Sequence, residues 1–201
     1  MKKKKKKQIK LRNKKLLKKY PFLAPIYWNG KRMPPREHKY EYTMLDDIPI
    51  GWRKAFAGFL IEDICNALKN NNIPLGELLF GQVKEKFGEL RIYTTGIYNE
   101  DVERVINNYT VMSRNICISC GKPDVPIVTN GWLCPYCKKC YENIGYNNKR
   151  VYKDVISRED VIPDAYVINR WNKYGSEFIE INIKDKADKI RRKYYKNHKE
   201  N

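Results

Sequence analysis

The sequence is poor in the groups that most catalytic sites require. It has two histidines, and it contains neither a phosphate-binding loop nor a GxGxxG motif. A Ser–His–Asp triad cannot be assembled, and the H-x-E and PCxxC elements of a zinc deaminase are missing. The acidic pairs Asp46–Asp47 and Glu62–Asp63 are nuclease candidates, but we interpret them as charges at a helix end and on a solvated helix turn. We therefore expect a protein that is not an enzyme and has no small-molecule substrate.

Long apolar runs are also absent. No segment approaches the roughly 18 consecutive apolar residues that span a bilayer, and the basic N-terminus is not followed by the apolar stretch of a secretory signal peptide. We expect a cytoplasmic protein without membrane contact. In that reducing compartment, paired cysteines indicate a metal site before a disulfide.

Acidic residues are missing from the first 20 positions, which contain eleven lysines and Arg12. This segment contributes +12 to the net charge of +18, and residues 184–201 contribute +5, so the middle of the chain is nearly neutral. Like charges repel each other, which predicts a disordered basic tail over 1–19 and a basic helix or tail over 184–201. Lysine neutralises phosphates without reading bases, so binding to nucleic acid should be largely sequence-tolerant. The residues expected to make these contacts are Lys2, Lys3, Lys4, Lys5, Lys6, Lys7, Lys10, Arg12, Lys14, Lys15, Lys18, Lys19, Arg191, Arg192 and Lys193.

The segment 20–115 has the pattern of an α+β body. Apolar residues at helical spacing predict helices over 51–70 and 99–115. Alternating apolar residues on either side of Gly88 predict a β-hairpin over 80–96. We expect the two helices to pack on an antiparallel sheet that contains this hairpin.

The C-terminal part, residues 142–183, is predicted to be smaller and rich in strands. The segments KRVYKDVIS, AYVINRW and FIEINIK each have strand-like composition, and Pro163 and Gly175 fall between them. With a zinc ribbon inserted at 116–141, the predicted fold class is α+β.

Five cysteines lie within the stretch CISCGKPDVPIVTNGWLCPYCKKC, residues 117–140. Cys117 and Cys120 form a C-x2-C unit followed by Gly121, and two such units about fifteen residues apart are typical of a zinc ribbon. The second unit is ambiguous, because Cys137 has this spacing both to Cys134 and to Cys140. A structural Zn²⁺ takes four ligands, so one of these two cysteines is spare.

Residues 20–141 resemble a group of uncharacterised proteins from bacteriophages, prophages and gut bacteria. The resemblance is carried by YPFL, YTMLDDIPIGWRKAFAGFL, QVKEKFGELRIY, CISCGKPD and GWLCPYCKKC, in that order. In that group the position that matches Cys134 is usually not cysteine. The resemblance therefore implies Cys117, Cys120, Cys137 and Cys140 as metal ligands. It implies a phage or mobile-element setting in a bacterial host cell, and it brings no known activity.

Three functions are compatible with these features. The first is a non-catalytic, zinc-ribbon accessory protein of a phage or mobile element that binds DNA or RNA through its basic ends. The second is an interaction protein that inhibits or redirects a host protein or ribonucleoprotein complex, such as a defence nuclease or a polymerase. The third is a virion or assembly component that contacts the packaged genome.

Overall fold

The computed structural model describes residues 2–129, 132–144, 161–172 and 175–198. The chain divides into two compact units, which we describe separately. The first consists of Met1–Pro49, Ala57–Lys86 and Leu90–Asn107, and the second of Ile50–Phe56, Phe87–Glu89 and Asn108–Asn201.

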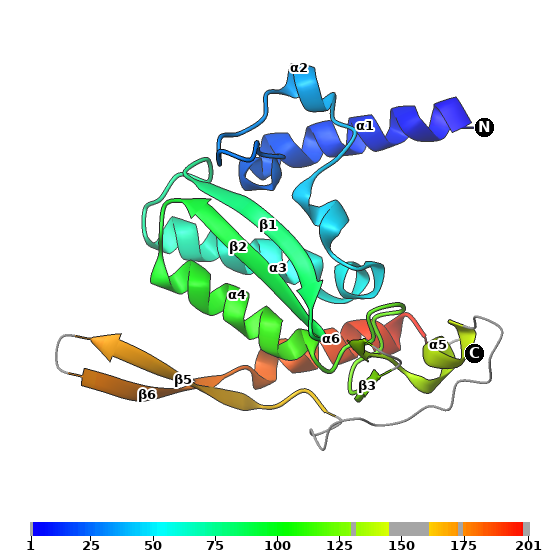
Figure 1. The fold of residues 1–201 in the computed structure, drawn as a ribbon, viewed down its shortest axis with the longest axis vertical. Helices are drawn as coiled ribbons and strands as arrows, with labels where there is room; N and C mark the ends of the chain where they lie inside the picture. Colours follow the sequence, from blue (N-terminus) through cyan, green and yellow to red (C-terminus); the bar gives the residue numbers. More distant parts are fainter. Residues whose placement is uncertain (1, 130–131, 145–160, 173–174, 199–201) are drawn as a thin grey trace. The chain divides into compact units, whose positions relative to one another are not determined.

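The first unit is built from helices and one hairpin (Figure 1). Its elements are α1 (Lys2–Lys19), η1 (Pro21–Leu23), α2 (Pro35–His38), η2 (Met44–Asp47), most of α3 (Ile50–Asn70), the strands β1 (Leu78–Lys86) and β2 (Glu89–Gly96), and the start of α4 (Glu100–Ser113). The two predicted helices and the predicted hairpin are therefore confirmed. The hairpin turns at Phe87 and Gly88, which both have positive φ, as a type I′ turn requires.

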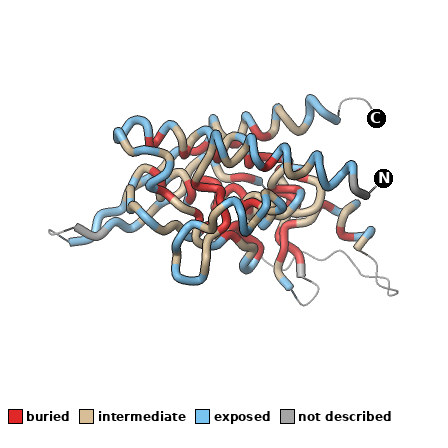
Figure 2. The backbone as a smooth tube through the Cα atoms, turned by 90° about the horizontal axis from the view of Figure 1, so that it is seen from above, coloured by how far each residue is buried: buried red, intermediate tan, exposed pale blue. Residues whose placement is uncertain are grey.

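The core of this unit is formed where the apolar stripes of α3 and α4 meet the hairpin. Leu60, Ile64 and Leu68 of α3 are fully buried, and Val102 and Ile106 of α4 are almost so (Figure 2). Phe80 of β1 packs against Phe22 of η1, with ring centroids 5.4 Å apart. Burial of large apolar side chains stabilises this arrangement, at about 25 cal/mol for each Å² removed from water.

The N-terminal basic segment differs from the prediction, because residues 2–19 form the helix α1 and not a disordered tail. Asn13 on this helix is completely buried, and its amide donates a hydrogen bond to the backbone oxygen of Tyr40 at 2.9 Å. Glu41 forms ion pairs with Lys6 and Lys10, at 3.2 and 2.8 Å. These attachments to the segment after α2 oppose the charge repulsion that predicted disorder.

The second unit contains the cysteine segment and the C-terminal elements. These are β3 (Ile127–Thr129), β4 (Leu133–Pro135), α5 (Lys138–Asn143), β5 (Ala165–Asn172), β6 (Gly175–Asn182) and α6 (Lys184–Lys196). Trp52, from the first turn of α3, is fully buried in this unit and donates a hydrogen bond from Nε1 to the backbone oxygen of Ile116 at 2.7 Å. Phe56 packs on Tyr109 of α4, with ring centroids 5.4 Å apart.

Three two-stranded antiparallel sheets occur in the described part of the chain, so the predicted α+β class is confirmed. The strands predicted in AYVINRW and FIEINIK are β5 and β6, which pair from Ala165↔Asn182 to Asn172↔Gly175. The strand predicted in KRVYKDVIS lies outside the described residues. The C-terminal basic segment is a helix, α6, which buries Ala187 and Ile190.

Candidate metal centre

Two tight turns of the second unit present the four cysteines that the resemblance implied. Cys117 and Cys120 flank the first turn, in which the Cys117 amide donates to Lys122 O and the Gly121 amide donates to Cys117 O, at 2.8 and 2.9 Å. Cys137 is the residue before α5, and Cys140 lies in the first turn of that helix. The antiparallel hairpin β3–β4 lies between the two turns along the chain and brings them close together.

The sulfur atoms of Cys117, Cys120, Cys137 and Cys140 all lie within 4.8 Å of one another. The Cys120 and Cys137 sulfurs are 3.8 Å apart. A tetrahedral site with metal–sulfur bonds of about 2.3 Å has sulfur–sulfur edges of about 3.8 Å. The cluster therefore has the donor type, number and spacing of a four-coordinate metal site, and it fits a zinc-ribbon-like module.

The remaining cysteines stand apart from this cluster. Cys134 is buried in β4 and pairs across the hairpin with Val128. Cys65 lies on α3 in the first unit, where burial raises the pKa of its thiol. The four clustered cysteines are thus the ones that the sequence resemblance implied, and Cys134 is a core side chain.

Electrostatics in the cluster favour one thiolate before any cation binds. A hydrogen bond from the Cys120 side chain, together with backbone amides of Cys137, Cys120 and Ser119, lowers the pKa of Cys117 to about 5 against the opposing effect of burial. Burial, and then repulsion by the Cys117 thiolate, raise the pKa of Cys140 to about 12. Backbone N–H groups directed at sulfur are the usual outer partners of metal-bound thiolates.

The first turn of α3 supports the first cysteine turn, and sequence reasoning missed this role. Gly51 donates its amide to Ile118 O at 2.8 Å. A Cβ at Gly51 would lie 2.2 Å from Cys117 O, and one at Gly121 would lie 2.7 Å from Gly51 O. Only glycines allow this approach of two backbones. The signal in the sequence is the glycine at the start of the helix predicted over 51–70.

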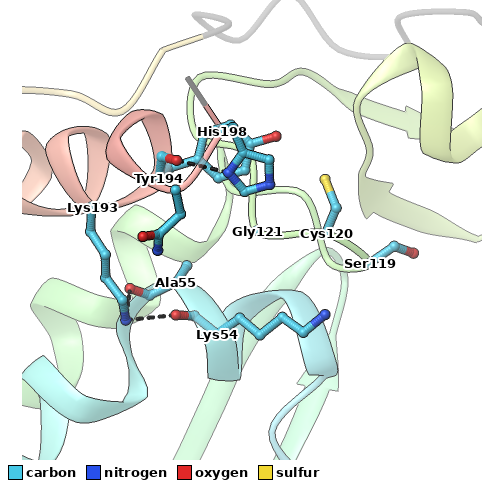
Figure 3. Close-up of a pocket in the computed structure, with 9 residues that line it drawn as sticks. Lys54, Ala55, Ser119, Cys120, Gly121, Lys193, Tyr194 and His198 are labelled. Carbon is cyan, nitrogen blue, oxygen red and sulfur yellow. Dashed lines mark hydrogen bonds between the residues drawn. The ribbon is translucent and has the colours of Figure 1, made fainter. Parts of the chain in front are cut away.

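Helix α6 borders the cluster through Tyr194 and His198 (Figure 3). The two rings are stacked, with centroids 4.0 Å apart, and a His198 ring nitrogen lies 2.8 Å from Tyr194 O. Burial raises the pKa of Tyr194, and a hydrogen bond with the Cys120 side chain raises it further. These residues line a cavity of about 410 Å³ together with Lys54, Ser119 and Gly121.

A second hollow opens beside the cluster on the α5 side. Its volume is about 680 Å³, and its lining includes the lysines Lys122, Lys138 and Lys139, the aromatic residues Tyr194, Tyr195 and His198, and one acid, Glu142. All three lysines are exposed. The region around the cysteines is therefore basic and partly aromatic.

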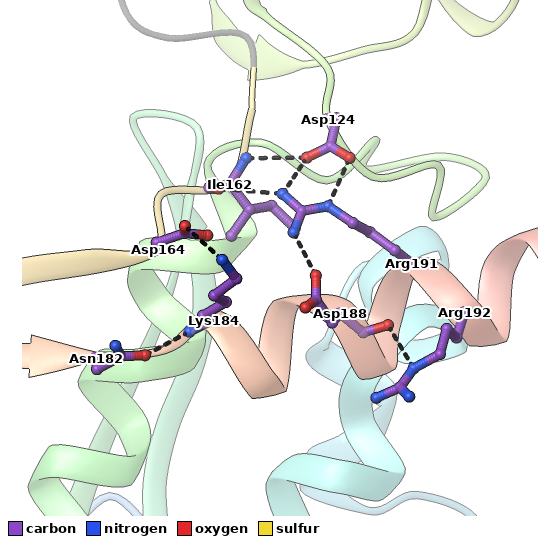
Figure 4. A network of polar contacts seen from close by, with 8 residues as sticks. All are labelled: Asp124, Ile162, Asp164, Asn182, Lys184, Asp188, Arg191 and Arg192. Carbon is purple, nitrogen blue, oxygen red and sulfur yellow. Dashed lines mark hydrogen bonds and ion pairs between the residues drawn. The ribbon is translucent and has the colours of Figure 1, made fainter.

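The three basic residues of α6 that we expected to bind nucleic acid are engaged within the protein. Arg191 donates from Nε and Nη2 to the two carboxylate oxygens of Asp124, each at 2.9 Å, and from Nη1 to Asp188 (Figure 4). Lys193 donates to the backbone oxygens of Lys54 and Ala55, at 2.7 and 3.1 Å. Arg192 makes a longer contact, from its Nε to Asp188 O at 3.3 Å. Arg191 and Lys193 thus stabilise contacts within the protein, a role that the sequence did not predict.

The expected residues of α1 are mostly presented to solvent. Lys4, Lys5, Lys7, Lys14, Lys15, Lys18 and Lys19 are exposed. Lys6 and Lys10 are paired with Glu41, and Arg12 lies 3.5 Å from Asp46. The side chains of Lys2 and Lys3 lie outside the described set.

Comparisons with known proteins give no relative for this chain: no family model, no curated protein and no solved structure matches it. Among the described helices, none is both long enough and apolar enough to cross a membrane.

Proposed function

We propose that the protein is a non-catalytic accessory protein of a phage or mobile element that binds nucleic acid and contains a structural zinc ribbon. Four thiolates favour Zn²⁺ over metals that prefer oxygen ligands, and they close its coordination sphere, which leaves no open position for a substrate. The zinc would fix the two cysteine turns and, through Cys120, the end of α6.

The observation that carries nucleic-acid binding is the charge of α1. The first turn of this helix contains lysines and no acid. A helix N-terminus carries a partial positive charge, so lysines there are unfavourable, and like charges one turn apart repel each other. Such a helix is stabilised when a polyanion lies along it. Lys4, Lys5 and Lys7 of this helix are exposed.

The surface beside the metal cluster supports the same function. Lys122, Lys138 and Lys139 surround a hollow that also exposes Tyr195, whose side chain is 47% accessible. Lysines that follow a backbone and aromatic rings that stack on bases are the two components of sequence-tolerant nucleic-acid binding. This surface replaces Arg191 and Lys193 as the contact region of the second unit.

The test is a salt titration of binding to a fluorescent duplex oligonucleotide, for which the log–log slope is about −0.9 per phosphate contact. The variant carries Lys4→Gln, Lys5→Gln and Lys7→Gln, and the matched control carries Lys31→Gln, Lys69→Gln and Lys189→Gln, which are equally exposed lysines. The loss of three phosphate contacts should weaken binding by about a hundredfold near 0.15 M salt and lower the log–log salt slope by about 2.7. The control should have a much smaller effect. Equal effects of the two triple variants would contradict the assignment to α1.

A second function is favoured by the hairpin β5–β6. Val167 and Phe178 are 60% and 75% exposed, and the register places both on the same face. Two exposed apolar side chains on one face of a two-stranded hairpin, beside the polar Asn169 and Glu180, are compatible with contact to a protein partner, such as a host complex. Substitution Phe178→Ser, followed by affinity purification with nuclease present, tests this: loss of a co-purified protein complex would favour the second function over the first.

A further inference from the structure

The first unit contains a pocket that the functions above do not use. Its volume is about 400 Å³, within the range of small-ligand sites. Leu17 of α1, Ala24 and Met33 are apolar lining residues, called the floor below. An open apolar pocket of this size has room for one flat ring system.

The charged residues of the lining, called the rim below, are all basic. They are Lys14, Lys18 and Arg32, and no acidic residue lines the pocket. Arg32 donates from Nη2 to the backbone oxygen of Gly76 at 2.9 Å, which fixes the guanidinium and leaves its other donors for a ligand. The charges of this rim are therefore complementary to a phosphate group.

Two further lining residues are held in place by local contacts. His38 and Tyr40 line the pocket, with their rings edge to face and centroids 5.1 Å apart. The Tyr40 amide donates to His38 Nδ1 at 3.0 Å, so Nε2 carries the proton of the neutral ring and can donate. Lys39 and Tyr40 both have positive φ, and buried Asn13 of α1 holds the Tyr40 carbonyl.

The pocket continues the exposed face of α1. Lys4, Lys7, Lys14 and Lys18 recur at spacings of three, four or seven residues, so they form one stripe along the helix. Leu11 lies within the stripe and is 53% exposed. A phosphate backbone that follows these lysines arrives at the pocket rim.

We propose that this pocket receives one unpaired nucleotide of a nucleic-acid strand that lies along α1, with the base on the apolar floor and its phosphate at Lys14, Lys18 and Arg32. The inference rests on the proposed nucleic-acid binding and specifies which form of nucleic acid is bound. A base inside a duplex is paired and stacked and cannot enter a pocket without being flipped out. The protein therefore prefers single strands.

The test measures binding of the full-length, metal-loaded protein to a 12-nucleotide single strand, to the duplex of the same length, and to a free nucleoside monophosphate. Lys14→Gln is compared with Lys15→Gln, which removes the same charge from the neighbouring position, outside the pocket. Met33→Trp fills the pocket without a change of charge, and its thermal unfolding is measured in parallel.

We expect the wild-type protein to bind the single strand about tenfold more tightly than the duplex. Lys14→Gln should weaken single-strand binding several-fold more than Lys15→Gln, whereas both should weaken duplex binding equally. Met33→Trp should remove most of the single-strand preference.

Three results would overturn the inference. Equal effects of Lys14→Gln and Lys15→Gln on the single strand would remove the pocket and leave the proposed function intact. Saturable, Lys14-dependent binding of the free nucleotide without single-strand preference would make the pocket a small-molecule site. If the wild-type protein binds no oligonucleotide, the proposed function itself fails.

Discussion

Helices α1 and α6 are both rich in lysine and arginine, and both were expected to hold a polyanion, but their basic side chains have different surroundings. In α6, Arg191 joins Asp124 and Asp188, and Lys193 binds two carbonyl groups of α3. In α1, Lys4, Lys5, Lys7, Lys14 and Lys15 are exposed. Arg191 and Lys193 of α6 stabilise the second unit, whereas the exposed lysines of α1 form a surface.

The difference shows that the net charge of a segment does not determine what each of its charged side chains contacts. Two acids at positions 185 and 188, and the buried Ala187 and Ile190, distinguish α6 from α1. Apolar residues at helical spacing bring a helix onto a core, and its arginines then meet acids such as Asp124. In α1 the buried position is the polar Asn13, so the helix is attached by hydrogen bonds and ion pairs at its surface.

The largest expected effect is that of removing the metal, which should destabilise α6 more than α1. Cys140→Ser should abolish metal binding, since a structural Zn²⁺ contributes on the order of 10–16 kcal/mol in small ribbons. α6 should then lose amide-exchange protection, because Tyr194 contacts Cys120. α1 has its attachments in the first unit and should change less. Metal content by mass spectrometry and hydrogen exchange of both helices measure this.

Cys134→Ser is the matched control for this prediction. Cys134 is a core side chain of β4 outside the cluster, so the variant should keep one metal per chain and protect α6 as the wild type does. If Cys134→Ser abolishes metal binding and Cys140→Ser does not, the assignment of the ligands is wrong.

The next effect concerns the arginine that holds α6. Arg191→Met should lower the free energy of unfolding by about 2 kcal/mol, since it leaves Asp124 without its charged partner in a partly buried place. Arg191 and Asp124 are only 24% and 22% exposed. Arg192→Met is the control at the next position and should stay within about 0.5 kcal/mol. Chemical denaturation followed by tryptophan fluorescence measures both, and equal losses would mean that α6 is held by its apolar face alone.

Much of the fold could be predicted because it depends on local patterns. The periodicity of 51–70 and of 99–115, and the turn at Gly88, are visible in the sequence and appear as α3, α4 and the β1–β2 hairpin. For the cysteines, spacing alone left Cys134 and Cys140 as alternatives, because both lie three residues from Cys137. The choice depends on the direction of each side chain: position 134 faces the core from a strand, whereas position 140 follows Cys137 on the first turn of α5.

The parts that could not be predicted depend on contacts between segments distant in the chain. The pairing of Arg191 with Asp124 joins residues 67 positions apart. The hydrogen bond from the Gly51 amide to Ile118 O, in the first cysteine turn, spans the same separation. Nothing in the local sequence of either partner specifies these contacts. The order of α1 was missed for the same reason, since Asn13 is held by Tyr40 and Lys10 by Glu41.

The smallest expected effect is at the attachment of α1. Ion pairs with Lys10 and Lys6 lower the pKa of Glu41, so this carboxylate supports α1 fully above the usual glutamate pKa of about 4.3 and loses the contribution as the pH falls below it. We expect amide protection in the first half of α1 to fall by about twofold between pH 6 and pH 3, after correction for intrinsic exchange. Glu41→Gln should reproduce the loss at pH 6, whereas Glu37→Gln, which removes a carboxylate that contacts Tyr27 and not α1, should not. If Glu41→Gln leaves protection unchanged, the ion pairs with Glu41 do not hold the helix, and its attachment depends on the Asn13 hydrogen bond and the ion pair of Arg12 with Asp46.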